Sequence, residues 1–122
     1  MSDLAKRFQE NPILQPADLR PSIPGMEIEC LLIYHGASAD PTRYCLGAML
    51  LDLHEPWKVL ARSGPPIMEP TAPYEQAGFF GNVVFTNGHL VDGDELTMYY
   101  GASDSVICGA RFSIEEILGT LR

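Results

Sequence analysis

The sequence predicts an all-β fold made of two unequal repeats of one antiparallel unit, about two four-stranded units of which one is incomplete, with short terminal helices. Three observations carry this prediction. The segment LLIYHGAS at 31–38 recurs as LTMYYGAS at 96–103, a Gly-Ala pair follows each repeat, and the pattern Pro-x-x-x-Pro occurs at both 12–16 and 66–70. Self-similarity of this kind indicates supersecondary units that bury their apolar faces against one another.

The predicted elements follow from apolar segments bounded by turn residues. A short helical turn near 3–9, capped by Ser2 or Asp3, precedes an extended proline-rich stretch to residue 26. Strands are expected at 28–35, 43–53, 57–62, 79–85, 88–92, 95–101 and 105–112. A Gly-containing hairpin turn lies at 92–94, and the capping-box pattern Ser113-x-x-Glu116 predicts a short C-terminal helix.

The two repeats are unequal. From Pro70 to Tyr99 there is room for two strands, whereas from Pro16 to Tyr34 there is room for one. With 46% hydrophobic residues, the chain has enough apolar surface for one small core. We therefore expect a single domain over 1–122, divided into an N-terminal segment at 1–27, a first unit at 28–64 that lacks its innermost or first strand, and a second unit with the helix at 65–122.

Charge and hydropathy exclude several classes of partner. The net charge is −8 and the eight Lys and Arg residues are scattered, so we expect no nucleic-acid binding, which depends on neutralising phosphates. No apolar run approaches the roughly eighteen residues of a membrane span. Residues 1–6 also lack the charged and apolar regions of a signal peptide. The expectation is an acidic cytoplasmic protein without a membrane partner.

Cysteine and histidine give no sign of a metal site. Cys30, Cys45 and Cys108 are odd in number, widely spaced and set in apolar segments, which favours buried free thiols over disulfides or zinc ligands. The three histidines do not cluster with them in sequence. The sequence therefore predicts neither a metal nor a cofactor.

Several segments together resemble one enzyme family. They are the two repeats at 31–36 and 96–104, YCLGAMLLDL at 44–53, PWKVLAR at 56–62, and YE through GFFGNVVF at 74–85. In this order they resemble the late blades of glycoside hydrolase family 130, the β-mannoside phosphorylases and related hydrolases on a five-bladed propeller. The resemblance covers residues 28–122 closely and implies that the two units are propeller blades.

The N-terminal region resembles a different part of the same family. Residues 7–14 and 21–27 are similar to the opening segment, which normally leads into the first blade. Here that segment leads straight into a late blade. The resemblance implies an internal deletion of roughly the central blades, rejoined near Glu29 or Cys30, which would explain the missing strand.

The implied deletion bears on catalysis. Glycoside cleavage needs a proton donor for the leaving oxygen, and phosphorolysis needs cationic groups that hold the attacking phosphate. In the family the donor is an aspartate on an early blade, and several phosphate-holding basic residues also lie upstream of the matching segment. Because none of those positions exists here, no catalytic residue is predicted.

Four residues resemble family positions that bind substrate or phosphate. Tyr34 and His35 match a Tyr-His pair that can donate to phosphate oxygens, although the pair could simply end an inner strand. Asp104 matches an aspartate that contacts sugar hydroxyls, but Asp after Gly-Ala-Ser is equally a turn residue. Asn82 lies in the family-like segment NVVF, which the resemblance places near the central channel of the propeller. An Asn at the start of a strand is, however, usually a backbone cap.

Two further features favour structural roles. The acidic residues at 92–95 are better read as a solvated hairpin turn than as paired catalytic carboxylates. Trp57, beside Pro56, could stack on a sugar ring, but a lone Trp at the start of a strand more often serves packing.

Three functions are compatible with the sequence. The first is a non-catalytic remnant of a family 130 enzyme that binds a mannose-containing oligosaccharide or inorganic phosphate weakly at most. The second is an active β-mannoside phosphorylase or glycosidase whose pocket is rebuilt between subunits, and the third is a structural or protein-interaction module. A homo-oligomer is expected, because two blades leave apolar faces that a complete ring would cover.

Overall fold

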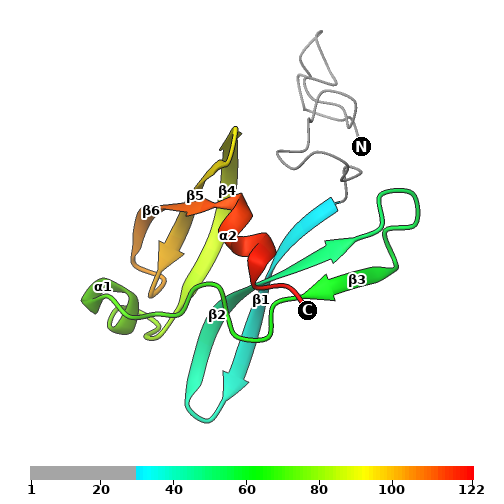
Figure 1. Ribbon diagram of the computed structural model, residues 1–122. Helices are drawn as coiled ribbons and strands as arrows, with labels where there is room; N and C mark the ends of the chain where they lie inside the picture. The colour runs from blue at the N-terminus through cyan, green and yellow to red at the C-terminus, as the bar shows by residue number, and fades with distance from the viewer. Residues whose placement is uncertain (1–29) are drawn as a thin grey trace, which may run out of the picture.

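The structure is a computed structural model and describes residues 30–122, which form two three-stranded antiparallel sheets and two short helices (Figure 1). The first sheet has the order β1 (Cys30–Ala39), β2 (Thr42–Leu51), β3 (Val59–Arg62). The second sheet has the order β4 (Val84–Asp92), β5 (Glu95–Ala102), β6 (Val106–Ser113). Helix α1 (Pro73–Gln76) lies between the sheets in sequence, and α2 (Ile114–Gly119) follows β6.

The sequence repeat is present in the pairing of the strands. Tyr34 of β1 lies opposite Gly47 of β2, and Tyr99 of β5 lies opposite Gly109 of β6. Strand β1 therefore corresponds to β5, and β2 to β6. In the second sheet β5 is flanked on its other side by β4, but among residues 30–122 no strand takes that place beside β1. Within the described residues, the strand that the first sheet lacks is thus the counterpart of β4.

The strand bounds correct the sequence prediction in the second unit. The expected strands at 79–85 and 88–92 are not separate: only the last two residues of the first, Val84 and Phe85, are in a strand, and they begin the continuous strand β4. This unit therefore has three strands rather than four. Glycines at 78 and 81, and Asn82 with φ of 60°, turn the chain before β4 begins. A register shift between Thr86 and Gly88 accommodates Asn87 inside β4.

Smaller differences affect the first sheet. Strand β1 extends to Ala39 rather than ending at residue 35, and β3 begins at Val59 rather than at residue 57. Trp57 therefore lies in the turn before β3 and is 74% exposed, so it does not pack into the core. Of the three cysteines expected to be buried, Cys45 is buried, Cys108 is half-buried and Cys30 is exposed.

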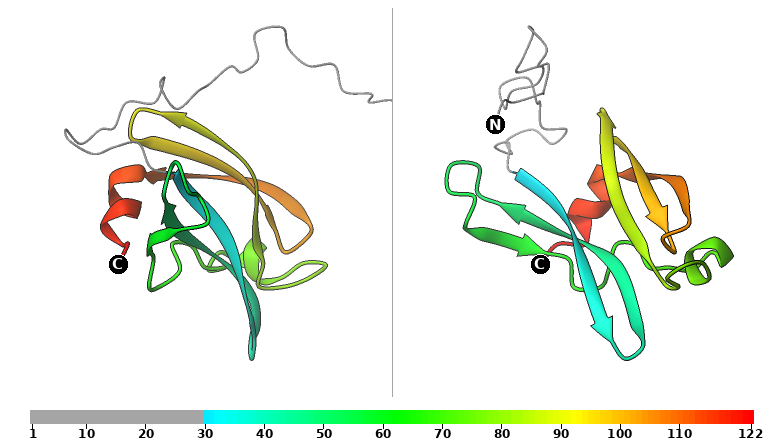
Figure 2. Two further views of the ribbon diagram at one scale, coloured as in Figure 1. Left: turned by 90° about the vertical axis from the view of Figure 1, so that its right-hand side faces the viewer. Right: turned by 180° about the vertical axis from the view of Figure 1, so that it is seen from behind.

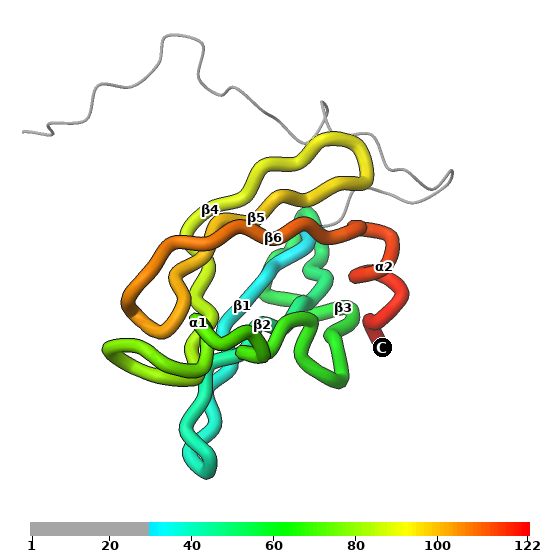
Figure 3. The backbone as a smooth tube through the Cα atoms, turned by 90° about the vertical axis from the view of Figure 1, so that its left-hand side faces the viewer, coloured from blue at the N-terminus to red at the C-terminus, as the bar shows by residue number. Residues whose placement is uncertain are grey.

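The hydrophobic core joins the two sheets. Its buried members are Leu46 from β2 with Val84, Leu96, Met98, Tyr100 and Ala102 from the second sheet. Burial alternates along β5, as expected of a strand with one face on a core. Ile67 and Met68 from the connecting segment pack on the same cluster. Figure 3 shows the second sheet lying across β1 and β2.

The C-terminal helix is capped as predicted and returns the chain to the first sheet (Figure 2). The hydroxyl oxygen of Ser113 accepts the N–H of Glu116 at 3.2 Å. Asp94, from the acidic hairpin turn, accepts the Ser113 hydroxyl at 2.6 Å and the N–H of Glu115 at 2.7 Å. Beyond the helix, Arg122 exchanges two backbone hydrogen bonds with Arg62 on the outer side of β3.

Some expectations concern residues outside the described range. The N-terminal helical turn and the segment at 1–27 lie there, as does Glu29, one of the two positions implied for the rejoining. The rejoining itself, near Glu29 or Cys30, and the domain bounds at 64 and 65 stay predictions. Within residues 30–122, no helix combines the length and apolar character needed to cross a membrane.

Candidate functional site

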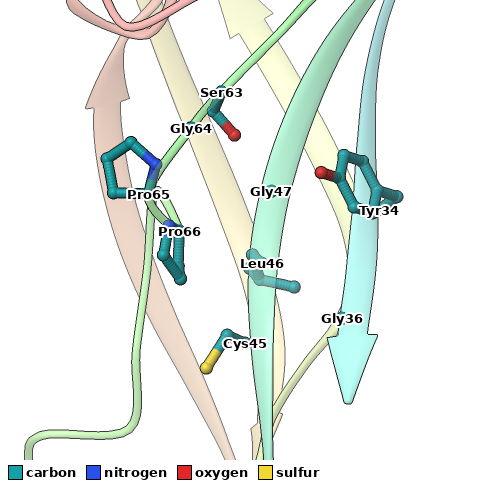
Figure 4. Close-up of a pocket in the computed structure, with 9 residues that line it drawn as sticks. All are labelled: Tyr34, Gly36, Cys45, Leu46, Gly47, Ser63, Gly64, Pro65 and Pro66. Atoms are coloured by element: carbon teal, nitrogen blue, oxygen red, sulfur yellow. The ribbon is translucent and has the colours of Figure 1, made fainter. Parts of the chain in front are cut away.

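Tyr34 lies over a glycine and borders a small pocket. Its ring sits where a side chain on Gly47 would be, since a Cβ there would come within 2.5 Å of Tyr34 Cζ. The guanidinium carbon of Arg62 lies 6.0 Å from the centre of the ring. The pocket beside it has a volume of about 100 Å³ and is shown in Figure 4. It is lined by Tyr34, Gly36, Cys45, Leu46, Gly47 and residues 63–66.

His35 points away from this pocket. Neighbouring side chains of a strand face opposite sides of the sheet, and the ring of His35 stacks on Phe85 of β4 with 3.7 Å between ring centres. Its Nε2 accepts the N–H of Thr86 at 3.0 Å, which requires a neutral ring with the proton on Nδ1. Burial lowers the pKa of His35, which favours the same neutral form. The predicted Tyr-His pair therefore does not converge on one ligand in this arrangement.

Asn82 and Asp104 lie close together at another part of the molecule. The backbone of Asn82 donates to the carbonyl of Gln76 at 3.2 Å and accepts the N–H of Tyr44 at 2.9 Å. Asp104, with φ of 52°, belongs to the exposed turn between β5 and β6. The residues next to them are joined, because the N–H of Ser103 donates to the carbonyl of Val83 at 3.0 Å. Both positions thus have a clear backbone role, while their side-chain roles stay predictions.

The buried carboxylate of Glu75 was missed by sequence reasoning. Glu75 is only 3% exposed, and its two oxygens accept the hydroxyl of Tyr100 at 2.7 Å and the N–H groups of Thr71 and Ala72 at 2.8 and 2.9 Å. A sequence signal was present: Pro73 at the first position of a helix, followed by Glu at the third, is typical of a capped N-terminus.

Within residues 30–122, three carboxyl groups have perturbed pKa values, and all three are lowered. Burial works to raise the pKa of Glu75, but hydrogen bonds from Ala72, Tyr100 and Thr71 outweigh it, so the pKa lies below its ordinary value. The N–H groups of Glu55 and His54 lower the pKa of Asp52. The Ser113 hydroxyl and the Glu115 N–H lower that of Asp94. All three side chains are held as anions by hydrogen bonds.

Most cations of the described part are engaged with glutamates. Arg43 pairs with Glu69 at 2.8 Å, Lys58 pairs with Glu55, and Arg111 lies 3.6 Å from Glu95. Arg62 is the cation beside the Tyr34 ring. In residues 30–122, no three His, Cys, Asp or Glu side chains gather as ligands for a metal ion.

Comparison with known proteins decides the family. The sequence profile described as β-1,4-mannooligosaccharide phosphorylase, that of glycoside hydrolase family 130, matches residues 3–122. The chain belongs to this family. It is 50% identical over 91 residues to a β-1,2-mannobiose phosphorylase from Listeria innocua, covering 75% of this chain and 25% of that protein. It is 40% identical over 124 residues to a 1,2-β-oligomannan phosphorylase from Thermoanaerobacter sp., covering 94% of this chain and 42% of that protein.

A solved family 130 structure supports the fold. The Listeria innocua β-1,2-mannobiose phosphorylase in complex with β-1,2-mannobiose aligns with a TM-score of 0.71 and 50% identity, over 74% of this chain and 25% of that one. The family 130 chain described here thus spans between a quarter and about two-fifths of the length of these curated relatives.

Proposed function

We propose that this family 130 chain is a non-catalytic protein with two blade-like sheets, which associates with other copies and binds inorganic phosphate or a mannose-containing oligosaccharide weakly. The observation that carries the proposal is the hydrogen bonding of Glu75, the only buried carboxylate of residues 30–122: its oxygens accept the Tyr100 hydroxyl and two backbone N–H groups, so it has no proton to donate. A glycosidic proton donor needs a raised pKa so that it keeps its proton near neutral pH. Glu75, Asp52 and Asp94 have lowered pKa values instead.

The pocket beside Tyr34 supports weak binding of a small anion. Its volume of about 100 Å³ is below the roughly 300 Å³ at which typical ligand pockets begin. The phenol of Tyr34 is a hydrogen-bond donor and Arg62 supplies a positive charge beside the ring, a pair that suits a phosphate oxygen. Among the four predicted binding residues, Tyr34 is therefore the one we assign to phosphate, with Arg62 as its partner.

The proposed binding of a mannose-containing oligosaccharide is supported by the names of similar proteins. Two of them are named for β-1,2-linked mannosides, and the aligned structure is described as a complex with β-1,2-mannobiose. The turn that carries Asp104, next to Asn82, is exposed and could offer a carboxylate to sugar hydroxyls. We therefore choose β-1,2-mannobiose as the sugar to test.

The test separates turnover from binding. With β-1,2-mannobiose and inorganic phosphate, we expect no release of sugar 1-phosphate above a protein-free control. Titration of phosphate, followed by NMR shifts, should show weak binding that is lost in Tyr34→Phe and Arg62→Gln. Arg43→Gln is the matched control, since Arg43 pairs with Glu69 away from the Tyr34 ring. Turnover that disappears in Tyr34→Phe would instead favour an active site rebuilt between subunits, and binding of neither ligand would favour a purely structural module.

A further inference from the structure

We propose that the outer edge of β1, which no strand of residues 30–122 covers, is the surface through which two copies of this chain associate, with β1 of one copy paired antiparallel to β1 of the other. The two first sheets then merge into one continuous sheet. This inference deepens the association included in the proposed function and specifies its interface.

The backbone groups on that edge can be identified from the contacts of β2. In an antiparallel ladder, residues directly opposite each other either exchange hydrogen bonds or both turn their N–H and C=O groups away. Three residues of β2 bond away from β1: Tyr44 N–H to Asn82 O at 2.9 Å, Leu46 N–H to Met68 O at 2.9 Å, and Ala48 O from Ser63 N–H at 2.8 Å. Their partners on β1 are Ala37, His35 and Ile33. These three residues therefore direct their N–H and C=O groups toward the outer edge.

In the second sheet, the edge equivalent to the outer edge of β1 is paired with a strand, β4. The residues of β5 that correspond to Ile33, His35 and Ala37 each lie opposite a residue of β4. β1 thus has the sequence of a central strand but occupies the edge of its sheet. Its ten residues include no Asp, Glu, Lys, Arg or Pro, the residues with which exposed edges usually prevent pairing.

A second copy of the chain fits this edge because the strand is complementary to itself. A two-fold axis beside Tyr34 places Ile33 opposite the partner's His35, and His35 opposite the partner's Ile33. The same register brings Tyr34 next to the partner's Tyr34. In this register the outward groups of Ile33 pair with those of the partner's His35 on both sides of the axis, and Ala37 lies opposite the partner's Leu31.

An exposed apolar face lies next to the edge. Four residues of the second sheet share this face through their cross-strand pairs, with exposed fractions of 44, 63, 48 and 73%: Phe85, Leu90, Tyr99 and Ile107. Phe85 stacks directly on His35 of β1. A strand laid along β1 therefore also adjoins this apolar face, which adds burial to the backbone pairing.

A cross-linking experiment tests the register. In a Cys30→Ser background, which removes the exposed thiol, Tyr34→Cys is expected to form a disulfide-linked dimer under mild oxidation, since two-fold neighbours meet the distance a disulfide requires. Leu32→Cys in the same background is the control: its residue lies on the same face, but the register places it opposite the partner's Gly36, so it should stay unlinked.

A second pair of variants tests the edge without new thiols. Ala37→Pro removes an outward N–H that has no hydrogen-bond partner within residues 30–122, and should halve the native mass in light scattering while the circular dichroism spectrum stays unchanged. Ala37→Ser keeps the N–H and should remain a dimer. A wild-type protein that is monomeric at micromolar concentration overturns both this inference and the proposed association. A dimer that Tyr34→Cys does not cross-link and Ala37→Pro does not dissociate overturns this inference alone.

Discussion

The hydroxyl of Tyr100 donates a 2.7 Å hydrogen bond to Oε1 of Glu75, and both side chains are buried. This bond fixes α1 against β5. Burial and the neighbouring carboxylate raise the pKa of Tyr100, so the phenol keeps the proton that it donates. The only buried carboxylate in the described part of the chain is therefore an anchor for a helix.

We expect Glu75→Ala to lower the free energy of unfolding by about 2–4 kcal/mol, because it leaves a buried hydroxyl and two backbone N–H groups without an acceptor. Urea denaturation followed by circular dichroism measures the change. Glu116→Ala, at an exposed position, should stay within about 0.5 kcal/mol of the wild type. Equal effects of the two substitutions would show that the Glu75 contacts contribute little.

The lowered pKa of His35 predicts a pH-dependent stability. The unfolded chain takes up a proton near the ordinary pKa of 6.5, whereas the folded protein resists protonation until a lower pH. The stability that this difference provides is complete above the unfolded pKa and is lost as the pH falls through the folded one. The lowered carboxyl pKa values of Glu75, Asp52 and Asp94 act in the same direction, but in a more acidic range.

The melting temperature should therefore decrease between pH 7.5 and 5.5, and His35→Gln should reduce this decrease. His54→Gln is the control, since His54 is exposed in the turn before β3 and should leave the slope unchanged. If His35→Gln and the wild type have parallel pH profiles, proton uptake at His35 does not control stability.

The contact between Tyr34 and Gly47 predicts a coupled pair of substitutions. A Cβ at Gly47 would lie 2.5 Å from Tyr34 Cζ, so Gly47→Ala should cost about 1–3 kcal/mol by forcing the ring aside. At the equivalent Gly109 the nearest atoms are 3.9 Å away, and Gly109→Ala should be tolerated. In a Tyr34→Ala background the cost of Gly47→Ala should largely vanish. A double-mutant cycle by urea denaturation measures the coupling, and strictly additive effects would rule it out.

The thiols should react in a defined order. Cys30 is exposed, whereas burial raises the pKa of the Cys45 thiol and so reduces its thiolate fraction. Timed alkylation followed by mass spectrometry should modify Cys30 first and Cys45 only after denaturation. Rapid labelling of Cys45 in the native protein would contradict its burial in β2.

Local patterns in the sequence predict part of this structure well. These patterns depend on residues close together in the chain. They are the repeat around Tyr34 and Tyr99, strands β5 and β6, and the Ser113 cap. The predicted start of β4 was wrong because the apolar residues before it suggest a strand. In the structure Gly78 instead packs closely against Ser103, where a Cβ would lie only 2.6 Å away. That restriction comes from packing across the chain and leaves no local pattern.

The candidate site was harder to predict for the same reason. Sequence places Tyr34 and His35 side by side, but the partners of His35 are Phe85 and Thr86, which lie far away in sequence. The strand geometry then separates the two rings, one toward the pocket and the other toward β4. The opposite orientation of the two rings is a local consequence of alternation along β1, whereas the partners that each ring contacts are set by long-range packing.

The two sides of the first sheet differ in a way that limits assembly. Leu121 bridges Ser63, and Arg122 bonds the backbone of Arg62, so the outer flank of β3 is already occupied there. A protein with two open flanks can add subunits without limit and grow into a filament. In the first sheet the chain itself occupies one flank, so the proposed pairing through β1 would leave this sheet no second flank for another copy.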